Sequence, residues 1–549
     1  HSTGKREAFI DPLSVKNNLE YGDDRTNVGS LTLTNTEYTS WEGKLAISYN
    51  ESINSHNINV GGGLEVKTTR RRTNTGTYKG VQSAEFSSPE FARSMPYKPN
   101  FQEVQTRLFG MFARLNYSYQ DIYLLDASLR IDGSSEFGSD KRYAPFFSGG
   151  LGLNIHKYAF MEKYGFVNHL KVRGSFGQTG KVNFAPYAAV PTHEIDIDEW
   201  YISGPASSLM TTRGNRDLKW EKTNKFDVGF ELGLLRNLLY LEFSWYNEIT
   251  NGLITDVTLP SSTGFRTYKS NMGKVENKGF EIQFRSDLLS TVDWYVAVFA
   301  NLAHNTNKIK KISDALKAYN DAVNEYYNQE IESLWDKDNP NLNRVMTKYE
   351  EGQSLSAKYG LKSLGIDPAN GQELYVYRDG TVSYDWIATE MRNIGDEMPW
   401  GTGSFGVNLR WKNITFSTSF LYEFGGDFYN ETLIDKVENA KIEEYNVDRR
   451  AMSQRWKKFG DVVMYKDIKD NRQTTDPTSR FMQRNNVLSW NSMTIGYELD
   501  REMLKRIGIE NIRIEVGTND LWRLSTVKAE RGLSYPYANS VNFSVNVRF

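Results

Sequence analysis

Two runs of alternating apolar and polar residues, joined by a short turn, occupy residues 226–254. The apolar positions of the first run are Phe226, Val228, Phe230, Leu232 and Leu234. Those of the returning run are Leu239, Leu241, Phe243 and Trp245. A period of two places these side chains on one face of a β-strand and the intervening polar residues on the other. The apolar face carries almost no charge over about ten residues, the length of a tilted strand that crosses a bilayer. The pattern therefore predicts two strands of a transmembrane β-barrel.

Composition is consistent with this interpretation. Mean hydropathy is −0.58, and no apolar run is long enough for a membrane-spanning helix. A barrel tolerates a hydrophilic average because half of each strand faces a polar lumen. The chain contains 32 Tyr, 29 Phe and 12 Trp, which fits strands and interfacial aromatic girdles. The formal net charge of −2 provides no field that would attract nucleic acid, and the absence of cysteine excludes disulfides and thiolate metal sites.

The same alternation recurs along the chain and predicts about 15 antiparallel strands. Their connections are alternately short and long, with long loops near residues 69–103, 179–221, 308–403 and 425–486. Within the third loop, apolar residues at helical spacing predict a helix at about Ser313–Trp335. Barrels of the outer membrane have short periplasmic turns and long extracellular loops, so the C-terminus is expected to be periplasmic. Residues 1–39 are then expected to be an extracellular loop segment, and residues 40–549 the barrel portion.

Seven segments, in order, resemble one family of membrane transporters. The longest reads LPSSTGFRTYKSNMGKVENKGFEIQF. The segments are Ala113–Gly138, Leu170–Gly180, Trp220–Leu235, Leu259–Phe284, Leu364–Gly380, Ile394–Pro399 and Tyr535–Phe549. Together they resemble the SusC/RagA-like TonB-dependent transporters, the nutrient importers of Bacteroidetes outer membranes. The resemblance implies TonB-dependent uptake of an oligosaccharide or a peptide by a Gram-negative bacterium. It also implies that the protein is not an enzyme and that a SusD-like surface lipoprotein lids the barrel, with two such pairs forming a dimer.

The chain departs from that family because the family's N-terminal parts are missing from the sequence. Barrels of this family have 22 strands and a plugged lumen, whereas the sequence shows neither a plug domain nor a TonB box. The hypothesis is that this is the C-terminal part of a transporter whose missing part supplies the plug, the other strands and the contact with TonB. Pairing of Trp41–Tyr49 with Val541–Phe549 would contradict it. The alternative is a passive porin-like barrel that closes on itself with about 16 strands.

Candidate functional residues lie mostly in the long loops. Aromatic residues expected to contact a substrate, or else to pack against loops or the lid protein, are Trp200, Tyr201, Trp335, Tyr384, Trp386 and Trp400. Asp196, Asp198 and Glu199 form either a weak calcium site or a solvated acidic loop. The terminal Phe549 resembles the signal read by the barrel-assembly machinery. No catalytic constellation, cofactor motif or histidine metal spacing stands out, so no cofactor other than calcium is expected.

Overall fold

A computed structural model gives the fold of the chain. It describes residues 1–549 except 14–27, 84, 86–87, 139–140, 183, 185, 202–203, 213, 237, 259–266, 272, 313–316, 319, 322–347, 441–446, 469–474, 500–503, 505–507, 529–538 and 549. Within 193–213 and 255–268 it describes backbone strands but not side chains. The predicted helix at Ser313–Trp335 lies almost wholly outside the described residues.

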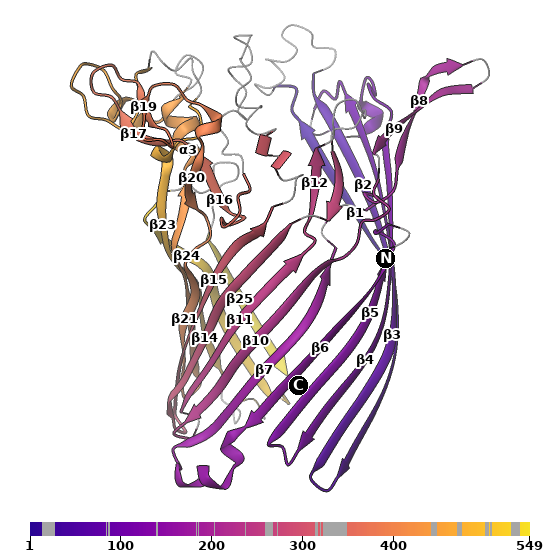
Figure 1. Ribbon diagram of the computed structural model, residues 1–549, viewed down its shortest axis with the longest axis vertical. Helices are drawn as coiled ribbons and strands as arrows, with labels where there is room; N and C mark the ends of the chain where they lie inside the picture. The colour runs from indigo at the N-terminus through magenta and orange to yellow at the C-terminus, as the bar shows by residue number, and fades with distance from the viewer. Residues whose placement is uncertain are drawn as a thin grey trace.

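Sixteen of the described strands form one antiparallel sheet, which curves into a barrel wall (Figure 1). In sheet order they are β1 (Ser2–Ile10), β2 (Ser30–Ile53), β3 (His56–Lys79), β4 (Asn100–Tyr119), β5 (Tyr123–Ser134), β6 (Tyr143–Asn154), β7 (Val167–Lys181), β10 (Glu221–Leu234), β11 (Leu239–Asn251), β14 (Lys274–Ser290), β15 (Trp294–Lys311), β21 (Gly401–Trp411), β22 (Ile414–Tyr429), β23 (Met482–Glu498), β24 (Asn511–Ser525) and β25 (Ser540–Arg548). Among the described strands, β1 pairs with β2 alone and β25 with β24 alone, so the sheet has two open edges.

The long connections gather at the upper end of the wall in Figure 1 and carry small elements of their own. Their strands are β8 (Thr192–Tyr201), β9 (Gly204–Thr212), β12 (Ile254–Thr258), β13 (Thr267–Asn271), β16 (Ala357–Gly360), β17 (Lys362–Ile366), β18 (Glu373–Val376), β19 (Val382–Ser383) and β20 (Arg392–Asp396). Their helical turns are η2 (Pro89–Phe91), η7 (Ala388–Glu390), α3 (Glu431–Leu433), η8 (Ile434–Glu438), α4 (Arg450–Ser453) and η10 (Ser479–Phe481). At the lower end lie η3 (Ile155–Lys157) and η4 (Ala159–Lys163).

The lower end also holds tight hairpin turns. Residues with positive φ at these turns include Asn54, Gln120, Asp121, Leu235 and Lys412. Two-residue hairpin turns need residues with positive φ, because the twist of such a turn matches the twist of the two strands that it joins. These turns coincide with short connections that the sequence predicted. The alternation of short and long connections is not strict, because residues 155–166 at the lower end form a longer connection than residues 135–142 at the upper end.

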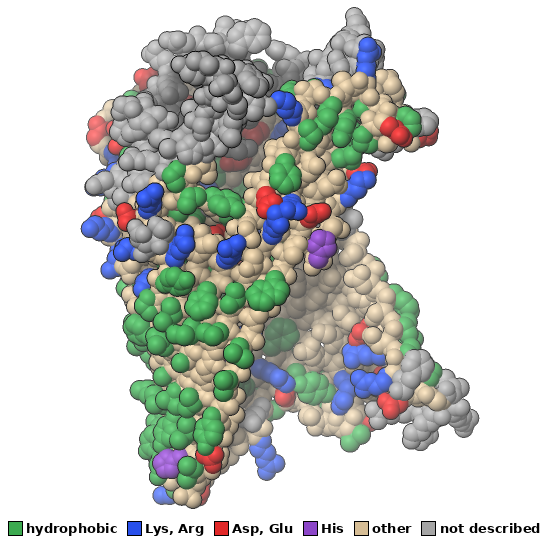
Figure 2. Space-filling model, turned by 90° about the vertical axis from the view of Figure 1, so that its right-hand side faces the viewer, with side chains coloured by type: hydrophobic (Ala, Val, Ile, Leu, Met, Phe, Trp, Pro, Cys, Tyr) green, Lys and Arg blue, Asp and Glu red, His purple; other side chains and the backbone are tan. Residues whose placement is uncertain are grey.

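The two faces of the wall differ in character, as the alternation predicted. The outward side chains include Phe543, which is 68% exposed, and Val545, which is 50% exposed. Figure 2 shows hydrophobic side chains spread over the lower wall, with a row of Lys and Arg above them. Exposed apolar surface of this extent is typical of a membrane-facing wall. In the described part of the chain, no helix is both long and apolar enough to cross a membrane.

Many glycines of the wall lie opposite an aromatic ring on the next strand. The pairs are Gly63–Phe112, Gly133–Tyr143, Gly279–Tyr246, Gly401–Phe424, Gly403–Tyr422 and Gly406–Phe299. In each pair the ring covers the space that a Cβ on the glycine would occupy. Such rings shield a glycine backbone and help to fix the strand register.

Two predictions about the N-terminal region are wrong. Residues 1–39 are not a loop segment, because β1 pairs with the first part of β2 from Ser2↔Tyr38 to Ile10↔Ser30. The predicted loop at 69–103 is also too long, since β3 continues to Lys79 and β4 begins at Asn100. Threonine side chains pair across these strands, with 3.2 Å between the hydroxyls of Thr34 and Thr75. Above the apolar band, polar residues occur on both faces of these strands, so the pairing continues although the regular alternation has ended.

Candidate functional site in the lumen wall and outer loops

The inward face of β7, β10 and β11 carries a charged network centred on Arg173. Its Nη2 donates to Glu242 Oε1 at 2.9 Å and to Ser244 Oγ at 2.7 Å. Its Nη1 lies 3.5 Å from Asp227 Oδ1. The sheet register places all of these residues on the face opposite to Phe226, Phe243 and their apolar neighbours. The wall therefore presents fixed charges to the lumen.

A second inward network on the same strands is centred on Glu231. Lys171 Nζ and His169 Nε2 each lie 3.2 Å from its carboxylate. Tyr240 donates its hydroxyl to the same carboxylate at 3.3 Å. The carboxylate is thus shared by three donors from two neighbouring strands, which fixes its position in the wall.

A third inward network lies on β3, β4 and β5. The Arg130 guanidinium donates to Asp132 at 2.6 Å and lies 3.3 Å from Glu65. Gly110 lies between them on β4, and a Cβ there would approach the guanidinium to 2.5 Å. The glycine therefore leaves the room that the arginine needs.

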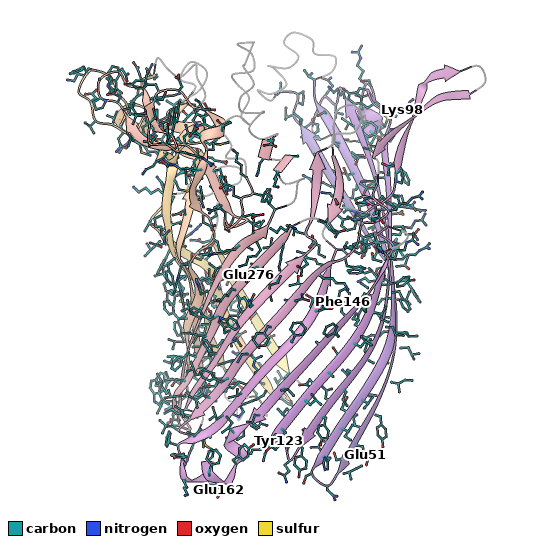
Figure 3. All side chains as sticks on the ribbon, viewed as in Figure 1. Glu51, Lys98, Tyr123, Phe146, Glu162 and Glu276 are labelled. Carbon is teal, nitrogen blue, oxygen red and sulfur yellow. The ribbon has the colours of Figure 1, made fainter. Side chains whose placement is uncertain are left out.

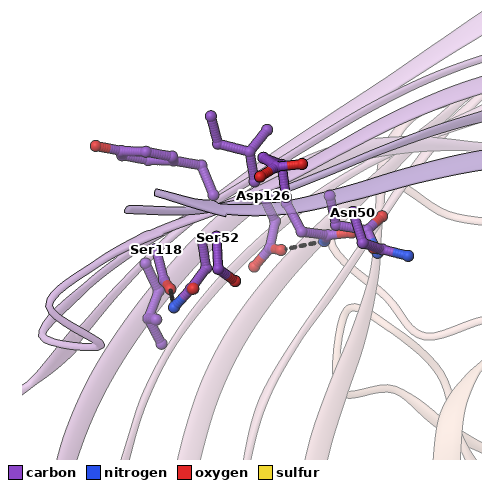
Figure 4. A pocket seen from close by; sticks show the side chains of 11 residues that line it. Asn50, Ser52, Ser118 and Asp126 are labelled. Carbon is purple, nitrogen blue, oxygen red and sulfur yellow. Dashed lines mark hydrogen bonds between the residues drawn. The ribbon is translucent and has the colours of Figure 1, made fainter. Parts of the chain in front are cut away.

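The inner wall also has an open hollow near the short-turn end (Figure 4). It encloses about 330 Å³, and its polar lining residues are Asn50, Glu51, Ser52, Asn57, Asn59, Asn116, Tyr117, Ser118 and Asp126. Asn57 Nδ2 donates to Ser118 Oγ at 3.2 Å, and Asn116 donates to Asp126. Amide and hydroxyl groups of this kind hydrogen-bond to sugars, peptides and polypeptide backbones alike. The hollow is suited to binding a polar partner by hydrogen bonds.

Above the wall, the loops between β15 and β23 pack into a body with its own apolar cores. One core contains Tyr429, Leu433, Ile434, Val437, Ala440, Ala451, Tyr465 and Phe481. A smaller one contains Leu361, Tyr375, Ala388 and Met391. We call the described residues within 348–396 and 429–481, that is, without 441–446 and 469–474, the loop body. Such cores make the loop body a folded unit rather than a set of independent loops.

A buried ion cluster connects three segments of the loop body. Arg480 Nη2 lies 2.7 Å from Glu373 Oε2 and 2.7 Å from Glu438 Oε1. The side chains are 5%, 5% and 0% exposed, respectively. Burial raises the pKa of the Glu438 carboxyl, but the charge and hydrogen bonds of Arg480 outweigh it and hold that pKa below its ordinary value. Sequence reasoning missed this cluster, because its members are far apart in the chain and share no motif.

The predicted aromatic site residues have different surroundings. The Tyr384 side chain is 45% exposed on the loop body, and its hydroxyl donates to Asp367 at 2.5 Å. Trp386 packs against the smaller core and donates its Nε1–H to the Pro477 carbonyl at 3.0 Å. Trp400 stacks on His304, with ring centroids 4.7 Å apart, and on Phe424 at 5.3 Å. The rings of His304 and Phe424 belong to the outward face of the wall, where Trp400 packs on them, and Trp386 packs into the loop body, so the packing alternative is favoured for Trp386 and Trp400.

The remaining candidates stay predictions. Asp196, Asp198, Glu199, Trp200 and Tyr201 all lie on β8, a strand of a loop hairpin whose side chains are not described. Trp335 and Phe549 lie outside the described residues. Within the described residues, no group of three or more His, Asp or Glu side chains is arranged to hold a metal ion.

Comparisons with known proteins agree with this architecture. Residues 2–415 match the family described as TonB dependent receptor-like, beta-barrel. TonB-dependent receptor P3 of Formosa agariphila is 24% identical over 93% of this chain and 52% of its own length. TonB-dependent receptor SusC of Bacteroides thetaiotaomicron is 27% identical over 60% of this chain and 32% of its own length.

Solved structures show the same fold. The RagAB peptide transporter superposes with a TM-score of 0.75 and 21% identity, over 91% of this chain and 53% of that one. The RagAB peptide importer in its open-open state gives a TM-score of 0.77 and 20% identity, over 96% and 55%. The chain spans about half the length of the first curated relatives that it matches. From the family match and the two-faced barrel wall, the chain belongs to the TonB-dependent receptor β-barrel family.

Proposed function

We propose that this chain is the C-terminal barrel portion of an outer-membrane importer that takes up a nutrient with energy delivered through TonB. The observation that carries the proposal is the 16-stranded wall, apolar outside and polar inside, in a chain of the TonB-dependent receptor family. In this proposal the long loops are extracellular and the C-terminus is periplasmic. The chain's contribution is physical rather than chemical: it supplies the wall, the loops and part of the substrate cavity.

The substrate we propose is an oligosaccharide or a peptide. Two observations support this class. The inner wall offers hydrogen-bonding amides, hydroxyls and fixed charges. Among the similar proteins, RagAB is described as a peptide transporter, and SusC as a TonB-dependent receptor. A SusD-like surface lipoprotein would cover the loop end and retain the ligand above the lumen.

The passive porin-like alternative requires the two sheet edges to pair with each other. In the described strands they do not: the partner of β1 is β2, and that of β25 is β24. Open strand edges in a bilayer leave backbone groups without hydrogen bonds, which costs several kcal/mol for each group. The arrangement therefore favours a wall completed by further strands over a small closed channel.

The test begins by purifying the intact complex from its native membrane and identifying the bound ligand by mass spectrometry. Uptake of that ligand, labelled, is then measured in cells with and without TonB, and with and without the partner lipoprotein. Uptake should be lost without TonB although the barrel remains in the membrane. Undiminished uptake without TonB would refute active import and support a passive channel.

A further inference from the structure

A row of aromatic rings runs across the outward face of the wall just below the loops. It contains Trp245 on β11, Phe280 on β14, His304 on β15, Trp400 immediately before β21, and Phe424 on β22. The Phe280 and His304 ring centroids are 5.2 Å apart, and His304 and Trp400 are 4.7 Å apart. Register pairs Trp245 with Phe280 and Phe280 with His304, so these rings share one face. Aromatic rows of this kind mark the level of the lipid headgroups.

Directly above this row, the outward face of β14 and β15 is basic. Lys278, Lys308 and Lys310 project from it, and the single acidic side chain among them is Glu276. Lys310 Nζ pairs with the Glu276 carboxylate at 2.7 Å. Figure 3 places Glu276 high on the wall, close to where the strands meet the loops. The group therefore carries a net charge of +2, from three lysines and one carboxylate.

Within the described part of the chain, two of these lysines form no close ion pair, although Glu276 is the register partner of Lys308. Lys278 lies with its Nζ 5.6 Å from the centre of the Trp245 ring, and neither it nor Lys308 has a carboxylate within ion-pair distance there. Both side chains are exposed. The ring beneath Lys278 orients the ammonium group without cancelling its charge. Long lysine stems can lie along apolar surface while their charged ends reach the headgroup region.

We propose that this basic group on the outer wall, Lys278 and Lys308 above Trp245 and Phe280, binds the phosphate groups of an anionic glycolipid in the outer leaflet. The proposal rests on the proposed function only for its orientation, with the loop end outside the cell. Basic residues beside a membrane surface attract anionic headgroups. The apolar wall below the aromatic row accommodates the acyl chains of the same molecule, which distinguishes a lipid from free phosphate.

The test uses the full-length protein reconstituted into phosphatidylcholine vesicles that contain bisphosphorylated lipid A. Native mass spectrometry then measures the lipid A retained on the protein. The double variant Lys278→Gln/Lys308→Gln should bind about 30-fold more weakly, as expected for two lysines at an anionic surface. Lys278→Arg/Lys308→Arg, which keeps the charge, should bind normally. Dephosphorylated lipid A with the same acyl chains should bind weakly to all forms.

A luminal variant provides the matched control. Lys171 and Lys225 face the lumen and pair with Glu231 and Glu248, at 3.2 Å and 2.8 Å. Lys171→Gln/Lys225→Gln should leave lipid binding unchanged. Equal binding by the outer glutamine variant, or equal binding of the dephosphorylated lipid, would overturn the proposal. Because no transport is measured, these outcomes are independent of whether uptake depends on TonB.

Discussion

Replacing Arg480 with methionine should open the loop body and leave the barrel wall folded. In the folded protein the guanidinium is shared by Glu373 and Glu438, and its Nη1 also donates to the Met464 carbonyl at 2.7 Å. The substitution leaves two carboxylates without their cation, in a place where the side chains are 5% and 0% exposed. Removing one partner of a buried pair typically costs about 3–5 kcal/mol. A loss of this size is comparable to the whole stability of a small folded unit.

An exposed arginine four residues away provides the control. Arg484 lies 3.2 Å from Asp427, but its side chain is 59% exposed. Exposed ion pairs contribute about 0–1 kcal/mol to stability, so Arg484→Ala should change the stability of the loop body little. Amide hydrogen exchange on the full-length protein measures both variants, with peptides from 429–440 and 475–481 reporting on the loop body. Unchanged protection there in Arg480→Met would refute the view that this cluster holds the loops together.

In the Arg480→Met variant, the stability of the loop body should also depend on pH in the opposite direction. In the wild type the pKa of Glu438 lies below its ordinary value of 4.5. Ionised Glu438 therefore stabilises the folded loop body above pH 4.5, and this stabilisation is lost as the pH falls and the folded form becomes protonated. Without Arg480, burial is the largest influence on the same carboxyl and raises its pKa, against the smaller lowering effects of the Lys466 charge and the Thr475 hydrogen bond. The variant loop body should therefore weaken as pH rises above about 4.5. Adding Glu438→Gln to Arg480→Met should recover part of the protection.

Three further predictions concern the wall and the loop body. Arginine at the outward Ala127 should cost about 2–4 kcal/mol of barrel stability in urea titrations, and arginine at the luminal Ser128 much less; equal costs would contradict the assignment of faces. Valine at Gly279, whose Cβ would meet the His304 carbonyl oxygen and the Tyr246 ring, should cost about 1–3 kcal/mol of barrel stability and lower the temperature up to which the barrel migrates as a folded band in gels. Valine at Gly149, whose Cβ neighbour is 3.8 Å away, should not. Burial lowers the pKa of Lys348 to about 8 from 10.5. Between these pH values the unfolded chain binds the Lys348 proton more strongly than the folded one, so the protection of the loop body from hydrogen exchange should rise with pH. Lys348→Met should flatten that rise.

The membrane-crossing strands were predictable from sequence because the bilayer imposes one simple rule on them. A lipid-facing side chain must be apolar at every second position, and Phe226–Leu234 follows this rule almost without exception. All of the roughly 15 strands predicted from alternation are present in the 16-stranded sheet. The one that was missed, β1 (Ser2–Ile10), lies beside the polar upper part of β2. Polar residues such as Thr32 and Thr34 are frequent on this part of β2, so the alternation that marks a membrane-crossing strand is absent there.

The loops obey no such rule, and the sequence predicted much less about them. Aromatic residues in a loop signal packing as readily as ligand binding, and Trp386 shows the ambiguity. Its ring completes a small core under the loop surface, and its Nε1–H finds a main-chain carbonyl. The buried Arg480 cluster depends on contacts between residues more than a hundred positions apart, such as Glu373 and Arg480. No local spacing in the sequence carries that information.

The loop body and the wall are stabilised by separate means, and this separation has a consequence for specificity. The wall depends on strand pairing and on the contrast between its two faces. The loop body has its own apolar cores and its buried ions, and the strand pairing below it shifts register between Glu423 and Gly426. At that irregularity Gly425 has a φ of 82°, and Trp400 packs against it. Exposed loop positions such as Tyr384 can therefore vary without disturbing either set of interactions, as a change of ligand preference would require under the proposed function.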